Sequence, residues 1–211
     1  MIVQRKSCRT DDWNRFILEG NLDALSRVYY SSYDLLFNYG LRLTADRQIV
    51  EDAIQNVFLS LMKSRKSISQ VKNPTGYLVS SFRHQLFSDI NQQNKTVLSE
   101  NFSDDQFDYF KSADLEPTEK EKFEILHSKV RECITHLTPK QQEILFLRFE
   151  TGISYEEISA LLNISVDSCY KSVYRSIRIV RDEVAKLSNG SQDLILWFLA
   201  GFSLHHRYSN R

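Results

Sequence analysis

Six residues in the last third of the chain carry hydrogen-bond donors at helical spacing. They are Ser168, Tyr170, Lys171, Tyr174, Arg175 and Arg178. Residues three, four and seven apart share one face of a helix, so these side chains would form a single polar surface. Hydroxyl, ammonium and guanidinium groups on such a surface can bind base edges and phosphates in the major groove of DNA. A solvated face on a core helix would explain any one of them alone.

The surrounding sequence predicts a helix-turn-helix that would present this surface. Thr138 and Ser154 each precede a Gln or Glu by three residues, which is the pattern of a capping box at a helix start. Gly152 supplies the left-handed residue that ends the first of these helices. Asn163 tolerates positive φ and would make the turn, and Ser165 would cap the longer third helix. The caps, the turn and the donor-rich face together favour DNA binding.

The composition is that of a soluble, mostly helical protein. The chain has 42% hydrophobic and 26% charged residues, with only six Gly and three Pro. Lys and Arg balance Asp and Glu at 27 each, so the net charge of zero predicts weak DNA affinity for the chain alone. Three cysteines without zinc or redox spacing favour buried thiols, and we expect no metal site and no cofactor. No signal peptide or membrane-spanning run is visible, so we expect a cytoplasmic protein without stable membrane insertion.

The N-terminal part reads as a run of four helices between residues 13 and 92. Asn21 is predicted to cap the second helix, and residues 44–46 to end it. The third helix, from about Asp46 to Lys63, would show a polar face opposite its apolar stripe. A turn is predicted at residues 73–76, before a fourth helix that runs from Tyr77 to Ile90. The predicted fold class is therefore all-α, with two small helical domains joined by a flexible linker and a helix-turn-helix in the C-terminal one.

Residues 24–62 and 76–90, followed by residues 137–186, resemble the second and fourth regions of bacterial RNA polymerase sigma factors of the sigma-70 family. The resemblance rests on the Asp-x-x-Gln-x-x-Phe series that begins at Asp52 and on the Leu-Thr-Pro and Ser-Tyr-Glu-Glu-Ile segments after residue 136. Two regions with a short linker are typical of the extracytoplasmic-function (ECF) group. The resemblance implies that region two lies at 1–92 and region four at 122–187. An acidic linker at 93–121 would join them, and an apolar tail would follow at 188–211.

The resemblance also implies partners and site residues. Core RNA polymerase would be bound through its β′ clamp and β flap, and the clamp would contact Asp52, Gln55, Asn56 and Phe58. Tyr77, Arg83 and His84 would bind the minus-ten promoter element as single-stranded DNA. The six donor residues would bind the minus-thirty-five element as duplex DNA. An anti-sigma factor is expected as a further partner.

Two segments and two alternatives remain open at the level of sequence. The linker carries three basic and eight acidic residues between 95 and 121, and would either mimic nucleic acid in the polymerase or act as a solvated tether. The tail holds eleven mostly apolar residues at 194–204, which would pack on a domain and could be autoinhibitory. A stand-alone helix-turn-helix regulator, for instance one like a response regulator, is the alternative function. An enzyme is disfavoured, because no catalytic motif and hence no catalytic residue is visible.

Overall fold

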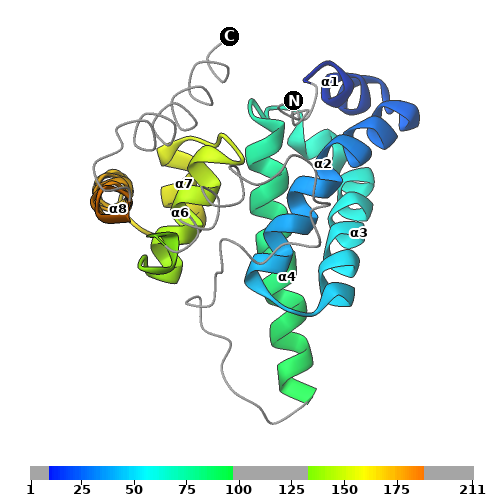
Figure 1. Cartoon of the computed structure of the whole chain (residues 1–211). Coiled ribbons are helices and arrows are strands. Elements are labelled where there is room, and N and C mark those ends of the chain that lie inside the picture. The colour runs from blue at the N-terminus through cyan, green and yellow to red at the C-terminus, as the bar shows by residue number, and fades with distance from the viewer. Residues whose placement is uncertain (1–9, 97–132, 188–211) are drawn as a thin grey trace, which may run out of the picture. The chain divides into compact units, whose positions relative to one another are not determined.

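The structure is a computed structural model that describes residues 10–96 and 133–187, and these residues are helical or in turns, without a strand. They form two bodies, at residues 10–96 and 133–187 (Figure 1), so that α4 extends past residue 92, where the linker was predicted to begin. This confirms the predicted all-α class with two small helical domains. The apolar tail and all of the predicted linker after residue 96 lie outside the described residues.

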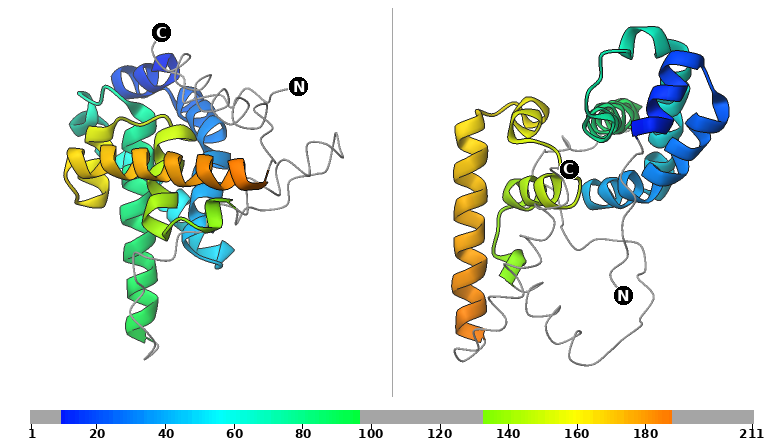
Figure 2. Two further views of the ribbon diagram at one scale, coloured as in Figure 1. Left: turned by 60° about the vertical axis from the view of Figure 1, so that its left-hand side comes forward. Right: turned by 90° about the horizontal axis from the view of Figure 1, so that it is seen from above.

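The first body contains α1 (Thr10–Glu19), α2 (Leu22–Leu43), α3 (Arg47–Ser64), the short 3-10 helix η1 (Arg65–Ile68) and α4 (Pro74–Thr96). Helices α2, α3 and α4 pack against one another side by side, and α1 packs on α2 and η1 (Figures 1 and 2). Their apolar stripes meet in a core whose largest fully buried side chains include Trp13, Tyr39 and Phe82. This packing holds the outward faces of α3 and α4 on a fixed frame.

Side-chain caps set the starts of these helices. The Asn21 Oδ1 accepts from the Ala24 amide at 2.9 Å, which confirms the predicted cap of α2. Asp46 caps α3 in the same way. The turn predicted at residues 73–76 is instead the start of α4, because Asn73 accepts from the Gly76 amide at 3.1 Å and Pro74 occupies the first helical position. Proline is favoured there, since that amide has no partner inside the helix.

Two further residues lie at the starts of helices, Leu22 at the start of α2 and Arg65 at the start of η1. Leu22, an apolar side chain, is 58% exposed at the first position of α2. Arg65 donates from Nη1 to the Ile17 carbonyl at 3.1 Å, which satisfies a backbone acceptor at the end of α1.

The second body contains α6 (Pro139–Phe149), α7 (Tyr155–Leu162) and α8 (Val166–Leu187). Both predicted capping boxes are present, at Thr138 with Gln141 and at Ser154 with Glu157. Gly152 has a φ of 73°, which confirms the predicted left-handed residue after α6. Helix α8 is seen end-on in Figure 1 and along its length in Figure 2, where α7 lies beside its first half. Helices α6 and α7 both pack on α8.

The described residues also bear on the predictions for thiols, membranes and metals. Cys133 and Cys169 are fully buried and form no disulfide, as predicted, whereas Cys8 lies outside the described residues. No helix within residues 10–96 or 133–187 is both long and apolar enough to cross a membrane. Within the same ranges, no three His, Cys, Asp or Glu side chains are grouped closely enough to hold a metal ion.

Candidate functional site

Helices α7 and α8 form the predicted helix-turn-helix. Asn163 ends α7 with a φ of 50°, and its amide and that of Ile164 both donate to the Ser159 carbonyl. The Ser165 hydroxyl accepts from the Ser168 amide at 3.1 Å, which confirms it as the cap of α8. Asn supplies the left-handed conformation at low cost and the serine satisfies a free amide at the helix start. The turn therefore fixes the direction in which α8 leaves α7.

The outer face of α8 carries all six predicted donors. Ser168, Tyr170, Lys171, Tyr174, Arg175 and Arg178 are each exposed, with Tyr170 at 51% and Tyr174 at 69%. The opposite face is an apolar stripe in which Cys169, Val173 and Val180 are buried. Burial raises the pKa of the Cys169 thiol, although Lys140 opposes this shift. The structure thus brings the donors together on one accessible surface.

A three-layer stack, which sequence reasoning missed, supports one edge of this surface. The ring of Tyr155, the first residue of α7, lies 3.9 Å from the ring of Tyr170, centroid to centroid. The Arg148 guanidinium lies 4.6 Å from the Tyr155 centroid, and its Nη1 donates to the Ile153 carbonyl at 3.0 Å. Burial raises the pKa of Tyr155, against the lowering effect of Arg148. Residues from α6, α7 and α8 together therefore orient Tyr170.

The polar face predicted on α3 is present, with one member inside the core. Asp52, Gln55 and Asn56 are exposed, and Gln48 donates from Nε2 to Asp52 Oδ1 at 3.0 Å. Phe58 is only 6% exposed and its ring packs edge-on against Tyr29, at 5.0 Å between centroids. It can hold α3 in place but cannot itself contact a partner as the helix is packed.

The face of α3 also has apolar members that the sequence reading did not single out. Leu59 and Met62 are 53% and 48% exposed, and lie four and seven residues after Gln55. Helical spacing places them on the same side of α3 as that residue. The exposed face of α3 therefore combines polar side chains with aliphatic ones.

The three residues predicted on α4 do not share one exposed surface. His84 is exposed, Tyr77 is half-buried with its ring 5.8 Å from that of Trp13, and Arg83 is only 8% exposed. The Arg83 guanidinium lies 4.5 Å from the centroid of the Phe87 ring. As the helix is packed, His84 is the accessible member, and Arg83 and Tyr77 support the surface from beneath.

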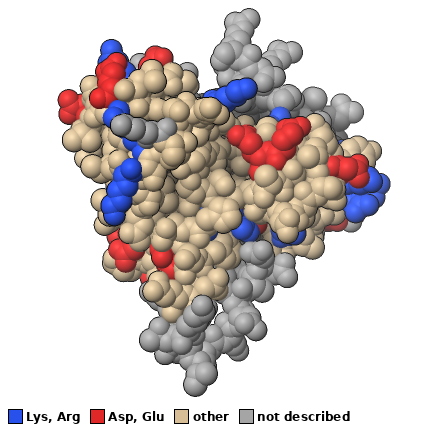
Figure 3. Space-filling view, turned by 180° about the vertical axis from the view of Figure 1, so that it is seen from behind, with Lys and Arg blue, Asp and Glu red and all other residues tan. Residues whose placement is uncertain are grey.

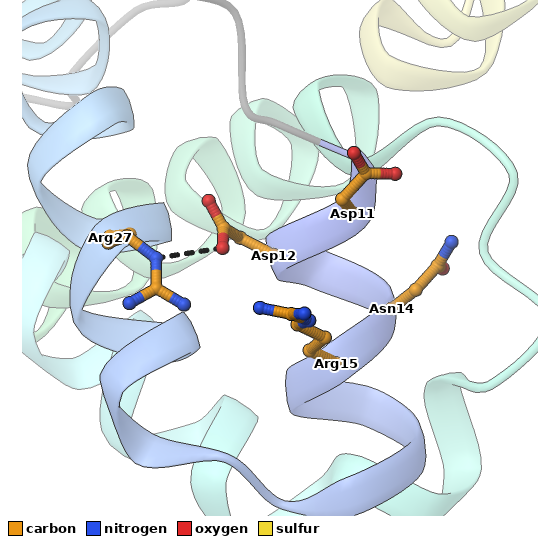
Figure 4. Close-up of a pocket in the computed structure, with 5 residues that line it drawn as sticks. All are labelled: Asp11, Asp12, Asn14, Arg15 and Arg27. Carbon is orange, nitrogen blue, oxygen red and sulfur yellow. Dashed lines mark hydrogen bonds and ion pairs between the residues drawn. The ribbon is translucent and has the colours of Figure 1, made fainter.

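A further polar feature is an open hollow where α1 meets α2 (Figure 4). It is lined by Asp11, Asp12, Asn14, Arg15 and Arg27. The Asp12 carboxylate, 10% exposed, accepts from Arg27 Nε at 2.8 Å, while Asn14 points away from this pair. Because two carboxylates and two guanidinium groups line the hollow, their charges offset one another. The pair joins α1 to α2, which gives the hollow a structural role.

The charges are otherwise mixed over the surface. Figure 3 shows small groups of both signs, separated by uncharged residues, on the face that it draws. This agrees with the zero net charge of the whole chain. The long-range attraction that brings strongly basic proteins to DNA is therefore weak here.

Comparison with known proteins identifies both bodies. The family model described as Sigma-70 region 2 matches residues 28–96, and the one described as Sigma-70, region 4 matches residues 127–180. Together they cover more than half of the chain. No curated protein sequence matches it.

Among the solved structures that share the fold are two with low sequence identity to this chain. One is the sigma factor RpoE from Bartonella quintana, solved with the anti-sigma factor NepR, at 15% identity and a TM-score of 0.51 over 81% of this chain and 97% of that one. The other is CnrH, solved with the cytosolic domain of CnrY, at 14% identity and a TM-score of 0.50 over 85% of this chain and 97% of that one.

Proposed function

This chain belongs to the sigma-70 family of bacterial RNA polymerase sigma factors, and we propose that its two bodies divide the work of promoter recognition. It is a sigma factor that directs transcription initiation, and we propose that it is one of the ECF group. In such a protein the polymerase supplies the catalytic chemistry. The sigma factor supplies surfaces for the polymerase and for the promoter. Because polymerase and promoter are cytoplasmic in bacteria, the chain would act there.

The second body is proposed to read the minus-thirty-five element as duplex DNA. The observation that carries this is the exposed donor row of α8, held by the helix-turn-helix and by the stack on Tyr155. A recognition helix places its N-terminal residues at base edges and its later residues at phosphates. Arg175 should make the strongest single contact, because its planar fork suits guanine or phosphate. The same body would bind the β flap of the polymerase.

The first body is proposed to bind the β′ clamp and the separated minus-ten strand. Asp52, Gln55 and Asn56 would make polar contacts with the clamp, beside the exposed Leu59 and Met62. On α4 the exposed His84 would contact an unstacked base directly. Flat aromatic rings bind single-stranded bases with little dependence on sequence, so His84 alone does not define the base.

An anti-sigma factor is proposed as the regulatory partner. RpoE was solved with the anti-sigma factor NepR, and CnrH was solved with the cytosolic domain of CnrY. The exposed face of α3 would be one surface for it, because a partner that covers this face would block the clamp.

Co-elution with core RNA polymerase tests the proposal. The full chain is mixed with core enzyme at moderate salt and passed over a size-exclusion column. We expect co-elution, and we expect Asp52→Ala/Gln55→Ala to elute separately. Glu19→Ala is the matched control, since it also removes an exposed carboxylate from the first body but lies at the end of α1. Transcription from a promoter library by the reconstituted enzyme then tests promoter selection.

The outcomes separate the two candidate functions. Loss of co-elution in the double variant, with the control unaffected, supports docking through α3. Co-elution that survives the double variant would place the docking surface elsewhere. Failure of the wild-type chain to bind core enzyme, with sequence-specific binding to duplex DNA by the chain alone, would favour a stand-alone regulator.

A further inference from the structure

An acidic side chain lies in the middle of the surface proposed to face DNA. Asp167 is the second residue of α8, and its side chain is 69% exposed. At 100° per residue, Asp167, Lys171, Tyr174 and Arg178 run down the centre of the exposed face, with Tyr170 at one edge and Arg175 at the other. A carboxylate in this position repels phosphates, so it works against non-specific binding.

Asp167 is paired with the lysine one turn further along the same face. Lys171 Nζ lies 2.6 Å from Asp167 Oδ2, and both side chains are largely exposed. The pair therefore presents an acceptor and a donor side by side near the N-terminal end of α8. That end is where a recognition helix contacts base edges.

We propose that Asp167 and Lys171 together read a C·G base pair in the major groove, an inference that rests on the proposed function of the second body. In a C·G pair the cytosine N4 amino group donates to guanine O6 at about 2.9 Å, so a donor and an acceptor also lie side by side there. Asp167 accepts from cytosine N4, and Lys171 donates to guanine O6 and N7. The spacing within the protein pair, 2.6 Å, is close to the spacing within the base pair.

The groups that flank these atoms favour C·G over A·T. An A·T pair also offers a donor, adenine N6, beside an acceptor, thymine O4. There, however, adenine N7 would place a second acceptor next to the carboxylate, and the thymine methyl group would lie beside the ammonium. In C·G the second acceptor, guanine N7, lies on the lysine side instead. Both flanks therefore select C·G.

Helix stability alone would also account for an Asp–Lys pair at this place. An acidic residue in the first turn interacts favourably with the helix dipole, and an i,i+4 pair adds a small further contribution. The two roles predict different results. A stabilising role affects binding to all DNA sequences in the same way, whereas base reading changes the preference at one position and leaves the others.

The experiment is selection from a duplex promoter library randomised over the minus-thirty-five region, with holoenzyme made from core polymerase and the full chain. The wild type is compared with Asp167→Ala, Asp167→Asn and Lys171→Met. Asp182→Asn is the control, because Asp182 is paired with Arg181 at 2.9 Å on the same helix and is similarly exposed, but lies four turns further along. Thermal unfolding of each variant verifies that it is folded.

We expect the wild type to prefer C·G at one position. In Asp167→Ala and in Lys171→Met, this preference should be weaker by a factor of about ten. Asp167→Asn should move the preference towards A·T, because a carboxamide suits adenine N6 and N7. Asp167→Ala should also bind duplex DNA without a promoter more tightly, since Lys171 becomes available to a phosphate. The plot of the logarithm of the binding constant against the logarithm of the salt concentration should be steeper by about 0.9. The Asp182 control should match the wild type.

Two results would overturn the inference in distinguishable ways. If the wild type selects a minus-thirty-five sequence and Asp167→Ala selects the same one with equal strength, the pair does not read a base but the second body does bind this element. If the wild-type holoenzyme selects nothing in the region, the proposed function of the second body fails, and the inference fails with it.

Discussion

Replacing Gly40 with alanine should destabilise the first body, although alanine is normally the better helix residue. Gly40 lies inside α2, where this helix meets α3 and α4. A Cβ atom added there would lie 2.6 Å from Val50 Cγ1 and 2.8 Å from Phe82 Cζ. Both neighbours are completely buried, and they approach from two different helices. Neither can move aside without displacing the rest of the core.

Two opposing effects set the magnitude. Alanine gains about 1 kcal/mol over glycine in a helix interior. Overpacking a close-packed core costs about 1–3 kcal/mol, and three contacts below 3.0 Å with two buried side chains, one of them the stiff β-branched Val50, place this site at the upper end. The expected net loss of unfolding free energy is about 2 kcal/mol. For a body of this size, that lowers the melting temperature by about 10 °C.

Denaturant unfolding followed by the fluorescence of Trp13, in a Trp197→Phe background, measures this loss in the first body. Trp13 is 1% exposed, so its emission reports on the core. The double variant Gly40→Ala/Val50→Ala supplies the control, because Val50→Ala removes two of the three close contacts. Its loss of unfolding free energy should be at least 1 kcal/mol smaller than the sum of the losses in the two single variants. A Gly40→Ala protein that is more stable than the wild type would refute the argument.

Two further predictions concern the second body. Ser176→Ala should raise the free energy of unfolding by about 1 kcal/mol, because the Ser176 hydroxyl is completely buried without a hydrogen-bond partner; urea unfolding that shows a loss would contradict this. The stability of this body should fall as the pH rises above about 9, because burial raises the pKa values of Cys169 and Tyr155 in the folded state and the unfolded chain therefore loses these protons first. Melting temperatures measured from pH 7 to 11 test this. Cys169→Ala should reduce the slope of melting temperature against pH.

The sequence predicted the features that depend on a few neighbouring residues. Both capping boxes, the caps at Asn21 and Ser165 and the left-handed Asn163 are as expected, since each is determined by a side chain and an amide two or three residues away. The donor row on α8 was also predictable, because helical periodicity alone separates it from Cys169, Val173 and Val180. These local rules were sufficient to find the helix-turn-helix.

The features that the sequence did not predict depend on contacts between segments that are distant in the chain. Arg83 was expected to be accessible, but the structure places its guanidinium under cover against Phe87. The stack of Arg148, Tyr155 and Tyr170 joins three helices, and nothing in the spacing of these residues reveals it. Asn73 and Pro74 carry both a turn signal and a helix-start signal, and the packing of α4 on α2 and α3 accompanies the second outcome.

The zero net charge of this protein is consistent with how a sigma factor acquires its affinity for DNA. A free-standing regulator depends on its own cations for binding, whereas a sigma factor is held near DNA by the polymerase, so a modest DNA contact acts at a high effective concentration. Selection on α8 can then favour discrimination over affinity. An Asp167 carboxylate that offsets Lys171 is unfavourable for a protein that binds DNA alone. It is an advantage for one that must reject most sequences while already tethered, because an acceptor facing the wrong base pair is left unpaired or repelled.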